Sequence, residues 1–257
     1  MRPHADPPSA LDARYDGESA DELARRLDLP RVVVYDEIGS TLDVAHEMAA
    51  GGAPAGTLIL ADAQSAGRGR LGRTWTSEPG AGIWLTLVER PRDVDALDVL
   101  SLRVGLDLAA ALESVCDERI RLKWPNDLYV ADRKLGGILV EARWRNEMPD
   151  WVAIGVGVNV RAPQGEDRAT GLRSDAARLT VLAAMVPAIR AAAARRGVLD
   201  ESELRAFAAR DVASGRACSE PIGGVVRGID SRGSLLVDVG SDTVAVRTGS
   251  LVLTEAR

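Results

Sequence analysis

Two lysines are conspicuous in this 257-residue chain because they are the only lysines among 32 basic residues. Lys123 and Lys134 lie within one short stretch, whereas the remaining 30 basic side chains are arginines. An ammonium is a compact point charge and a guanidinium is a planar fork, so the two are not interchangeable at a tight site. We therefore expect both positions to need an ammonium. The alternative is that two lysines cluster by chance.

A second cluster combines glycines and arginines at residues 67–73, with the sequence GRGRLGR. Three glycines let the backbone adopt positive φ and approach a ligand closely, and three arginines supply forked donors for carboxylate or phosphate. The segment follows a predicted buried strand and predicts a mobile anion clamp. It matches neither a Walker loop nor a dinucleotide-binding fingerprint. A solvated basic turn and a nucleic-acid contact are the alternatives, and the net charge of −6 disfavours the second.

The lysines themselves belong to two further motifs. Residues 123–127 (KWPND) end one strand and begin the next through a tight turn, for which Pro, Asn and Asp are suited. Residues 134–141 (KLGGILVE) and 155–160 (GVGVNV) have glycines inside strands, where they often mark the close approach of a ligand. We expect Lys134 to place its ammonium against a buried anion. The alternatives are a purely structural turn and a lysine that points to solvent.

Hydrophobic periodicity predicts the elements that position these motifs. The helices are expected at 18–29, 40–50 and 95–114, with two more within 175–210, and Ser40 with Asp43 suggests a capping box at the second. Ser40-Thr41 is thus interpreted first as a helix cap. The strands are expected at 31–36, 57–61, 82–89, 119–124, 127–130, 134–142 and 151–160. Helices mixed with hairpin-linked strands favour an α+β fold over a doubly wound one.

The chain divides into three regions by pattern. Residues 1–30 form an N-terminal extension with one short helix, and residues 1–16, rich in Pro and Asp, are expected to be loosely ordered. Residues 31–210 form the main domain. Residues 211–257 lose all helix signals and show short strands at 225–229, 235–239 and 244–247, which predicts a small β-barrel supported by the main domain.

The composition excludes several classes of protein. The acidic balance argues against a broad nucleic-acid-binding face or an anionic membrane partner. Cys116 and Cys218 lie far apart and fit two buried thiols in a reducing compartment. With His4 and His46 as the only histidines, a zinc site or a Ser-His-Asp triad is not expected. No signal-peptide pattern and no long apolar run occur, so we expect a cytoplasmic protein.

Four motifs together resemble those of the biotin protein ligases: residues 67–75 (GRGRLGRTW), 123–127, 134–141 and 155–159 (GVGVN), in the order and spacing of that family. The resemblance covers about residues 31–257. It implies a mixed, largely antiparallel sheet flanked by helices, like that of class II aminoacyl-tRNA synthetases, and a C-terminal SH3-like β-barrel. It also implies that ATP and biotin form biotinyl-5′-AMP, with Mg²⁺, and that a lysine of a biotin carboxyl carrier domain of acyl-CoA carboxylase then takes the biotin.

The resemblance assigns roles to the matching positions. Lys134 and Arg70 are implied as catalytic, and Asp127 as a metal ligand. Biotin is implied to bind Ser40, Thr41, Gln64, Arg68, Gly69, Arg70, Lys134, Gly137, Gly155 and Gly157. ATP is implied to bind Arg70, Arg73, Trp75, Lys123, Asn126, Lys134 and Asn159, with Trp75 stacking on adenine. A ureido ring needs donors and acceptors, which Ser, Thr and Gln supply, and a carboxylate needs a cation.

The chain also departs from the family pattern. Leu42 stands where the family commonly has Asn, which removes one amide contact, and Gly136 stands where many members have Ala. Only about 30 residues precede the first strand, so a winged helix and a repressor function are not expected. The rivals are a lipoate–protein ligase and a DNA-binding biotin sensor. The glycine-rich strands and the hairpin are candidates for pairing in a homodimer.

Overall fold

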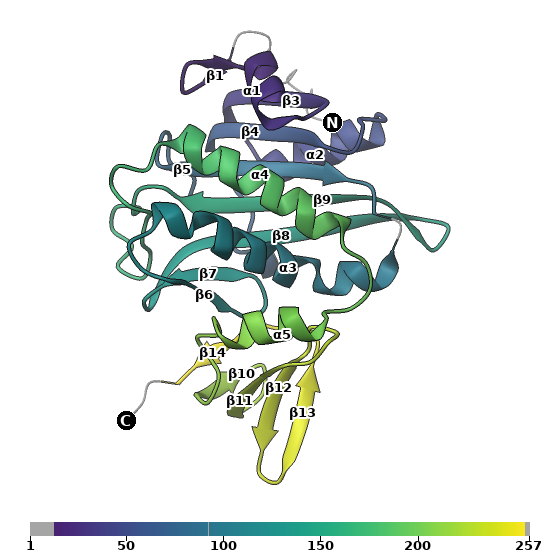
Figure 1. Cartoon of the computed structure of the whole chain (residues 1–257), viewed down its shortest axis with the longest axis vertical. Helices are drawn as coiled ribbons and strands as arrows, with labels where there is room; N and C mark the ends of the chain where they lie inside the picture. The colour runs from purple at the N-terminus through teal and green to yellow at the C-terminus, as the bar shows by residue number, and fades with distance from the viewer. Residues whose placement is uncertain (1–12, 92, 255–257) are drawn as a thin grey trace, which may run out of the picture.

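The computed structural model describes residues 13–91 and 93–254, and its centre is a seven-stranded mixed sheet (Figure 1). The strand order is β3-β4-β5-β9-β8-β7-β6, in which β3 and β4 run parallel and every other neighbouring pair is antiparallel. The bounds are β3 Arg31–Ile38, β4 Thr57–Gln64, β5 Gly82–Glu89, β6 Ile120–Lys123, β7 Asp127–Val130, β8 Arg133–Arg145 and β9 Met148–Asn159. The predicted α+β class with a largely antiparallel sheet is confirmed.

Helices cover both faces of this sheet. The helices are α1 Ala20–Leu27, α2 Thr41–Ala50, α3 Val94–Leu112, α4 Arg178–Ala194 and α5 Glu201–Ala208. The larger core joins α1, α3 and α4 to one face, while α2 packs on the other face against β4, β5 and β9 (Figure 1). Strand β4 shows why both faces are covered, because Leu58 and Leu60 enter the larger core while Ile59 and Ala61 enter the α2 core.

The C-terminal region forms a second, five-stranded antiparallel sheet with the order β13-β12-β11-β10-β14. Its strands are β10 Ala217–Glu220, β11 Gly224–Ile229, β12 Leu235–Val239, β13 Asp242–Val246 and β14 Val252–Leu253. Strands β11, β12 and β13 match the predicted ones, whereas β10 and β14 were not predicted. The indole of Trp124 donates a hydrogen bond to Gly233 O at 2.9 Å, which ties this sheet to the 123–127 turn.

Two sequence-based expectations near the N-terminus need correction. Residues 1–16 were expected to be loosely ordered. Of these, residues 1–12 lie outside the described part of the chain, and for residues 13–16 the expectation is wrong. Strand β1 (Arg14–Tyr15) pairs with β2 (Glu18–Ser19), and Tyr15 is buried with its hydroxyl donating to Gly82 O at 3.2 Å. Helix α1 begins at Ala20 rather than at Glu18, because Ser19 caps it in a capping box with Glu22.

The predicted capping box at Ser40 is also wrong. Ser40 does occupy the N-cap position of α2, but its side chain makes no capping hydrogen bond, and its buried hydroxyl has no partner among the described residues. Asp43 pairs with Arg68 instead. A buried hydroxyl without a partner costs free energy unless a ligand or water satisfies it. The long central helix ends at Leu112, followed by a 3₁₀ turn (Glu113–Val115). Among the described residues, none of the helices has the length and apolar character to span a bilayer.

Candidate active site

The site is a cavity on the face of the large sheet that α2 covers, next to the N-terminal end of that helix. Its floor is set by strand register, since Gly137 of β8 lies opposite Gly157 of β9, and Leu139 opposite Gly155. Alternate strand residues point to the same face, so these four positions share one surface. The volume is about 960 Å³ when the open solvent at the mouth of the cavity is included.

The floor glycines make room for two side chains of the chain itself. A Cβ atom at Gly157 would lie 2.6 Å from Nε1 of Trp75, and one at Gly155 would lie 2.9 Å from Cδ1 of Leu42. These glycines were predicted to admit a ligand, and in the structure they first admit Trp75 and Leu42 to the cavity wall. The Trp75 indole N–H is buried and has no partner within the described residues.

A polar end of the cavity lies at the start of α2. The side-chain oxygen of Gln64 accepts hydrogen bonds from the backbone N–H of Thr41 at 2.9 Å and from its hydroxyl at 3.1 Å. The Gln64 amide donates to Ser77 Oγ at 2.8 Å, and the buried Thr86 hydroxyl donates to Thr41 Oγ1 at 2.9 Å. These bonds fix the orientation of Gln64 and Thr41. The free hydroxyl of Ser40 lies beside them and can bind one polar group of a ligand.

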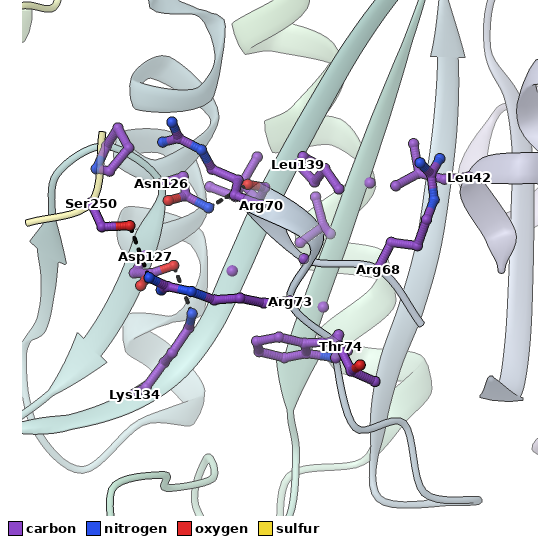
Figure 2. Close-up of a pocket in the computed structure, with 18 of the residues that line it drawn as sticks. Leu42, Arg68, Arg70, Arg73, Thr74, Asn126, Asp127, Lys134, Leu139 and Ser250 are labelled. Atoms are coloured by element: carbon purple, nitrogen blue, oxygen red, sulfur yellow. Dashed lines mark hydrogen bonds and ion pairs between the residues drawn. The ribbon is translucent and has the colours of Figure 1, made fainter. Parts of the chain in front are cut away.

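The opposite end of the cavity is cationic. Lys134 Nζ lies 2.8 Å from Oδ1 of Asp127 and 5.2 Å from the centre of the Trp75 ring, and Figure 2 shows Asp127 and Lys134 facing one another. Burial lowers the pKa of Lys123 and of Arg70, and in both cases Asp127 opposes the shift. Arg70, Arg73, Lys123 and Lys134 line this end of the cavity around Asp127, the single carboxylate of the lining, whereas Arg68 lines the cavity beside Leu42 (Figure 2). This end is suited to an anion.

The Gly/Arg loop forms one wall of the cavity. Its base is closed by hydrogen bonds from Gly69 N to Arg73 O at 2.8 Å and from Trp75 N to Gly67 O at 2.9 Å. Of the three glycines, only Gly72 has a positive φ, of 73°. Gly67 is needed instead for close packing, since a Cβ atom there would lie 2.4 Å from the backbone oxygen of Trp75. The expected use of positive φ by all three glycines is therefore corrected to one of them.

The C-terminal sheet reaches the same cavity, which the sequence did not reveal. Gly249, Ser250 and Leu251 line it, and Arg73 donates to Ser250 Oγ at 2.9 Å (Figure 2). The segment lies between β13 and β14. Alternating strands in this region predicted a barrel, but no pattern in residues 247–251 predicted contact with the Gly/Arg loop.

The cavity brings together nearly every residue predicted for the site. The lining includes Ser40, Thr41, Gln64, Arg68, Gly69, Arg70, Arg73, Trp75, Lys123, Asn126, Asp127, Lys134, Gly137, Gly155 and Gly157. The exception is Asn159, whose buried side chain donates to Thr170 O at 3.0 Å and does not line the cavity. The individual roles of these residues remain predictions. Sequence reasoning missed Thr86, because a lone Thr in a strand carries no functional signal.

The arrangement is suited to a ligand that is polar at one end, apolar in the middle and anionic at the other end. Leu42 and Leu139 supply the apolar wall between the polar group near Ser40 and the cations near Lys134. Clustered guanidinium and ammonium groups stabilise negative charge that develops during a reaction. The cavity can therefore hold two anionic substrates together and activate one of them.

Comparison with known proteins agrees with this chemistry. The Biotin/lipoate A/B protein ligase family model matches residues 37–159. The biotin--[acetyl-CoA-carboxylase] ligase of Mycobacterium tuberculosis is 36% identical over 245 residues, which cover 85% of this chain and 87% of that protein. The chain belongs to the biotin protein ligase family. The bifunctional ligase/repressor BirA of Bacillus spizizenii is 38% identical over 130 residues, and this match spans 50% of the chain but only 40% of that relative.

Solved biotin protein ligases share the fold. The Aquifex aeolicus enzyme, in complex with biotin and ATP, has a TM-score of 0.71 and 25% identity over 89% of this chain and 100% of that one. The Leishmania major enzyme, in complex with biotinyl-5-AMP, has a TM-score of 0.60 and 25% identity over 88% of this chain and 99% of that one.

Proposed function

We propose that this biotin protein ligase joins biotin to AMP and then to a lysine of a biotin carboxyl carrier domain of acyl-CoA carboxylase. One observation carries the proposal: a single cavity connects a polar group around Ser40 and Gln64 to the cations around Lys134. Biotin has a ureido ring, an apolar valeryl chain and a carboxylate, in that order. This order matches the order of groups along the cavity. The relatives from Mycobacterium tuberculosis and Aquifex aeolicus support the same activity.

In the proposed first step, a carboxylate oxygen of biotin attacks the α-phosphorus of ATP. A phosphorus–oxygen bond forms, the bond between that phosphorus and the bridging oxygen breaks, and pyrophosphate leaves with the electron pair. Two anions must meet for this to happen. Lys134 and Arg70 would neutralise the charge that develops, while Ser40 and Gln64 would hold the ureido ring. No protein nucleophile is needed.

In the second step, the neutral amine of the acceptor lysine attacks the acyl carbon of biotinyl-5′-AMP. The carbon–nitrogen bond forms, the carbon–oxygen bond to phosphate breaks, AMP leaves and the amine proton passes to solvent. The mixed anhydride would hydrolyse if water reached it, so the Gly/Arg loop is proposed to cover it. Trp75 would stack on the adenine, and Lys123, Asn126 and Arg73 would contact the nucleotide. Asn159 would act from outside the cavity lining.

Mg²⁺ is part of the proposal as a partner of the triphosphate. Mg²⁺ in nucleotide sites usually takes one or two carboxylates and completes its shell with phosphate and water. The donor set here fits that mode, because Asp127 is the one carboxylate of the lining. Asp127 would therefore hold the ion, which supplies charge neutralisation at the phosphates.

We also infer the wider organisation of the protein. Residues 31–210 would form the catalytic domain and residues 211–257 an SH3-like barrel, with residues 1–30 as an extension. A cytoplasmic location fits the two free cysteines, and the net charge of −6 disfavours DNA and anionic membranes as partners. The exposed Trp144 and Met148 at the end of the β8–β9 hairpin favour a homodimer. Sedimentation of the purified protein would test that assembly.

The decisive experiment compares substrates. Exchange of labelled pyrophosphate into ATP should depend on biotin and not on lipoate, and mass spectrometry should find biotin on one lysine of a carrier domain. Exchange with lipoate alone would assign the chain to lipoate ligation. Salt-dependent retention of biotin-operator DNA without any exchange would instead identify a sensor. Removing Mg²⁺ with a chelator should abolish the exchange of pyrophosphate into ATP.

A further inference from the structure

Arg68 differs from the other arginines of the Gly/Arg loop in where its side chain lies. Its two terminal nitrogens lie 3.0 Å and 3.1 Å from the two carboxylate oxygens of Glu141, and one of them lies 3.1 Å from Asp43. Figure 2 shows Arg68 beside Leu42 and apart from Arg70 and Arg73. Its guanidinium is therefore bound to carboxylates of the protein. The charge available to a ligand comes from the other two arginines.

Glu141 is itself held by a second side chain. It belongs to β8, and His46 Nε2 on α2 lies 2.9 Å from its Oε2. The indole of Trp151 on β9 lies 3.0 Å from His46 Nδ1. An indole N–H can only donate, so Nδ1 accepts and Nε2 carries the proton that is donated to Glu141. Three neighbouring elements thus fix one carboxylate in place.

The loop has few other side-chain anchors. Leu71 at its tip is 70% exposed and has a positive φ of 56°, so the tip is not held by packing. Arg73 contacts Ser250 at the far side of the cavity. A loop that must order itself over a ligand pays conformational entropy, and every anchor made beforehand reduces that cost.

From this geometry we propose that Glu141 and His46 are positioning residues of the ligase. They fix one end of the Gly/Arg loop through Arg68, so that Arg70 and Arg73 meet the ligand from a defined position. The proposal rests on the proposed function for its consequence, but its structural part concerns the ligand-free loop alone. Arg68 then serves as the anchor of the loop, and its predicted contact with biotin would involve its backbone rather than its guanidinium.

The structural part is tested by limited trypsin digestion of the ligand-free protein, with cleavage after Arg70 and Arg73 followed by mass spectrometry. Glu141→Gln should speed cleavage in the loop by about threefold to tenfold, the range expected for a charge-assisted pair that is partly exposed. The matched control is Glu201→Gln, which removes the carboxylate that lies 3.3 Å from Arg205 on the surface of α5 and should leave the loop unchanged. Equal cleavage in Glu141→Gln and wild type would overturn the proposal.

His46 permits a sharper comparison. The amide nitrogen of a glutamine can take the place of Nε2 and still donate to Glu141, whereas an asparagine can replace only Nδ1 and still accept from Trp151. His46→Asn should therefore loosen the loop and His46→Gln should not. This pair decides the question even if Glu141→Gln does not fold. Equal effects of the two substitutions would show that His46 acts by packing alone.

The functional consequence is measured separately. Biotinyl-5′-AMP should leave the Glu141→Gln and His46→Asn proteins about threefold to tenfold faster than it leaves the wild-type protein, by the same energetic range. If the wild-type protein forms no adenylate, the proposed function is wrong, but trypsin digestion still tests whether Glu141 and His46 hold the loop through Arg68. If adenylate forms and the variants release it at the wild-type rate, the positioning role fails.

Discussion

Replacing Gly157 with alanine should weaken the binding of ATP much more than the binding of biotin. The added Cβ atom would lie 2.6 Å, 2.7 Å and 3.0 Å from three atoms of the Trp75 indole. Carbon atoms pack favourably at about 3.5–4.0 Å, so the ring must retreat by about 1 Å. A ring is rigid, and it cannot yield by turning one flexible tip aside.

The loss of affinity for ATP can be estimated from the proposed stacking of Trp75 on the adenine. Stacking of a base on an aromatic ring contributes about 1–3 kcal/mol, which corresponds to roughly fivefold to 150-fold in affinity. We expect Gly157→Ala to lose part of this and to raise the KM for ATP about tenfold. The resemblance implies that Gly157 contacts biotin, but the KM for biotin should change much less, because the three nearest atoms to the added Cβ all belong to the Trp75 ring. Pyrophosphate exchange at varied ATP and at varied biotin measures both constants.

Two further glycines supply the comparison. At Gly155 a Cβ atom would lie 2.9 Å from the tip of Leu42, so Gly155→Ala should act on the biotin side. At Gly223 no atom lies within 4 Å of the added Cβ, so Gly223→Ala should leave both constants unchanged. Thermal unfolding must show that all three variants fold. A folded Gly157→Ala protein with the wild-type KM for ATP would refute the assignment of Trp75 to the nucleotide.

Three other predictions follow from single contacts. Glu203→Gln breaks the buried pair with Arg103, whose Nε lies 2.8 Å from Glu203, and should lower the free energy of unfolding by about 3–5 kcal/mol in urea titrations; an unchanged midpoint would contradict this. Lys123→Met should raise the KM for ATP at least about tenfold yet stabilise the empty protein at pH 7. Burial lowers the Lys123 pKa below its ordinary 10.5, so the folded state disfavours the ammonium. The extra stability of Lys123→Met should therefore vanish as the pH rises to 10.5, where the lysine becomes neutral in both states. Extra stability that persists at that pH would refute burial of the charge as its cause. Ser250→Ala removes the acceptor of Arg73 and should raise the KM for ATP about threefold, whereas no change would mean that the contact is irrelevant to the nucleotide.

Periodicity predicted the main sheet well because most of its strands are long and carry a clear side-chain pattern. Strand β5 was predicted with its observed bounds, and the predicted ranges for β3, β8 and β9 are shorter than the observed strands. The N-terminal hairpin was missed because Arg14–Tyr15 is too short for any pattern. Its stability comes from burying Tyr15 against the main domain, which is a tertiary effect that local sequence does not carry.

The residues of the site were predictable by type but not by partner. Glycines inside strands marked the cavity floor correctly, yet only the register of β8 and β9 shows that Gly137 and Gly157 lie side by side. The capping-box pattern at Ser40 and Asp43 misled, because an arginine 25 positions from Asp43 competes for its carboxylate. Hydrogen bonds between distant segments, such as the one from Arg73 to Ser250, leave no periodic signal.

The charge distribution shows why a protein with a net charge of −6 can hold two anionic substrates. Carboxylates outside the cavity pair with many arginines, as Asp107 and Glu203 do with Arg195. In the cavity lining, Arg68 is paired with Glu141 and Asp43, which leaves four cations and one carboxylate. Coulombic attraction is screened within about 8–10 Å at ordinary salt, so a ligand in the cavity responds to those four cations more than to the acidic surface. The position of the arginines, rather than their number, therefore decides what binds. This is the reason why the side chain of Arg68, turned toward Glu141, has a different consequence from that of Arg70.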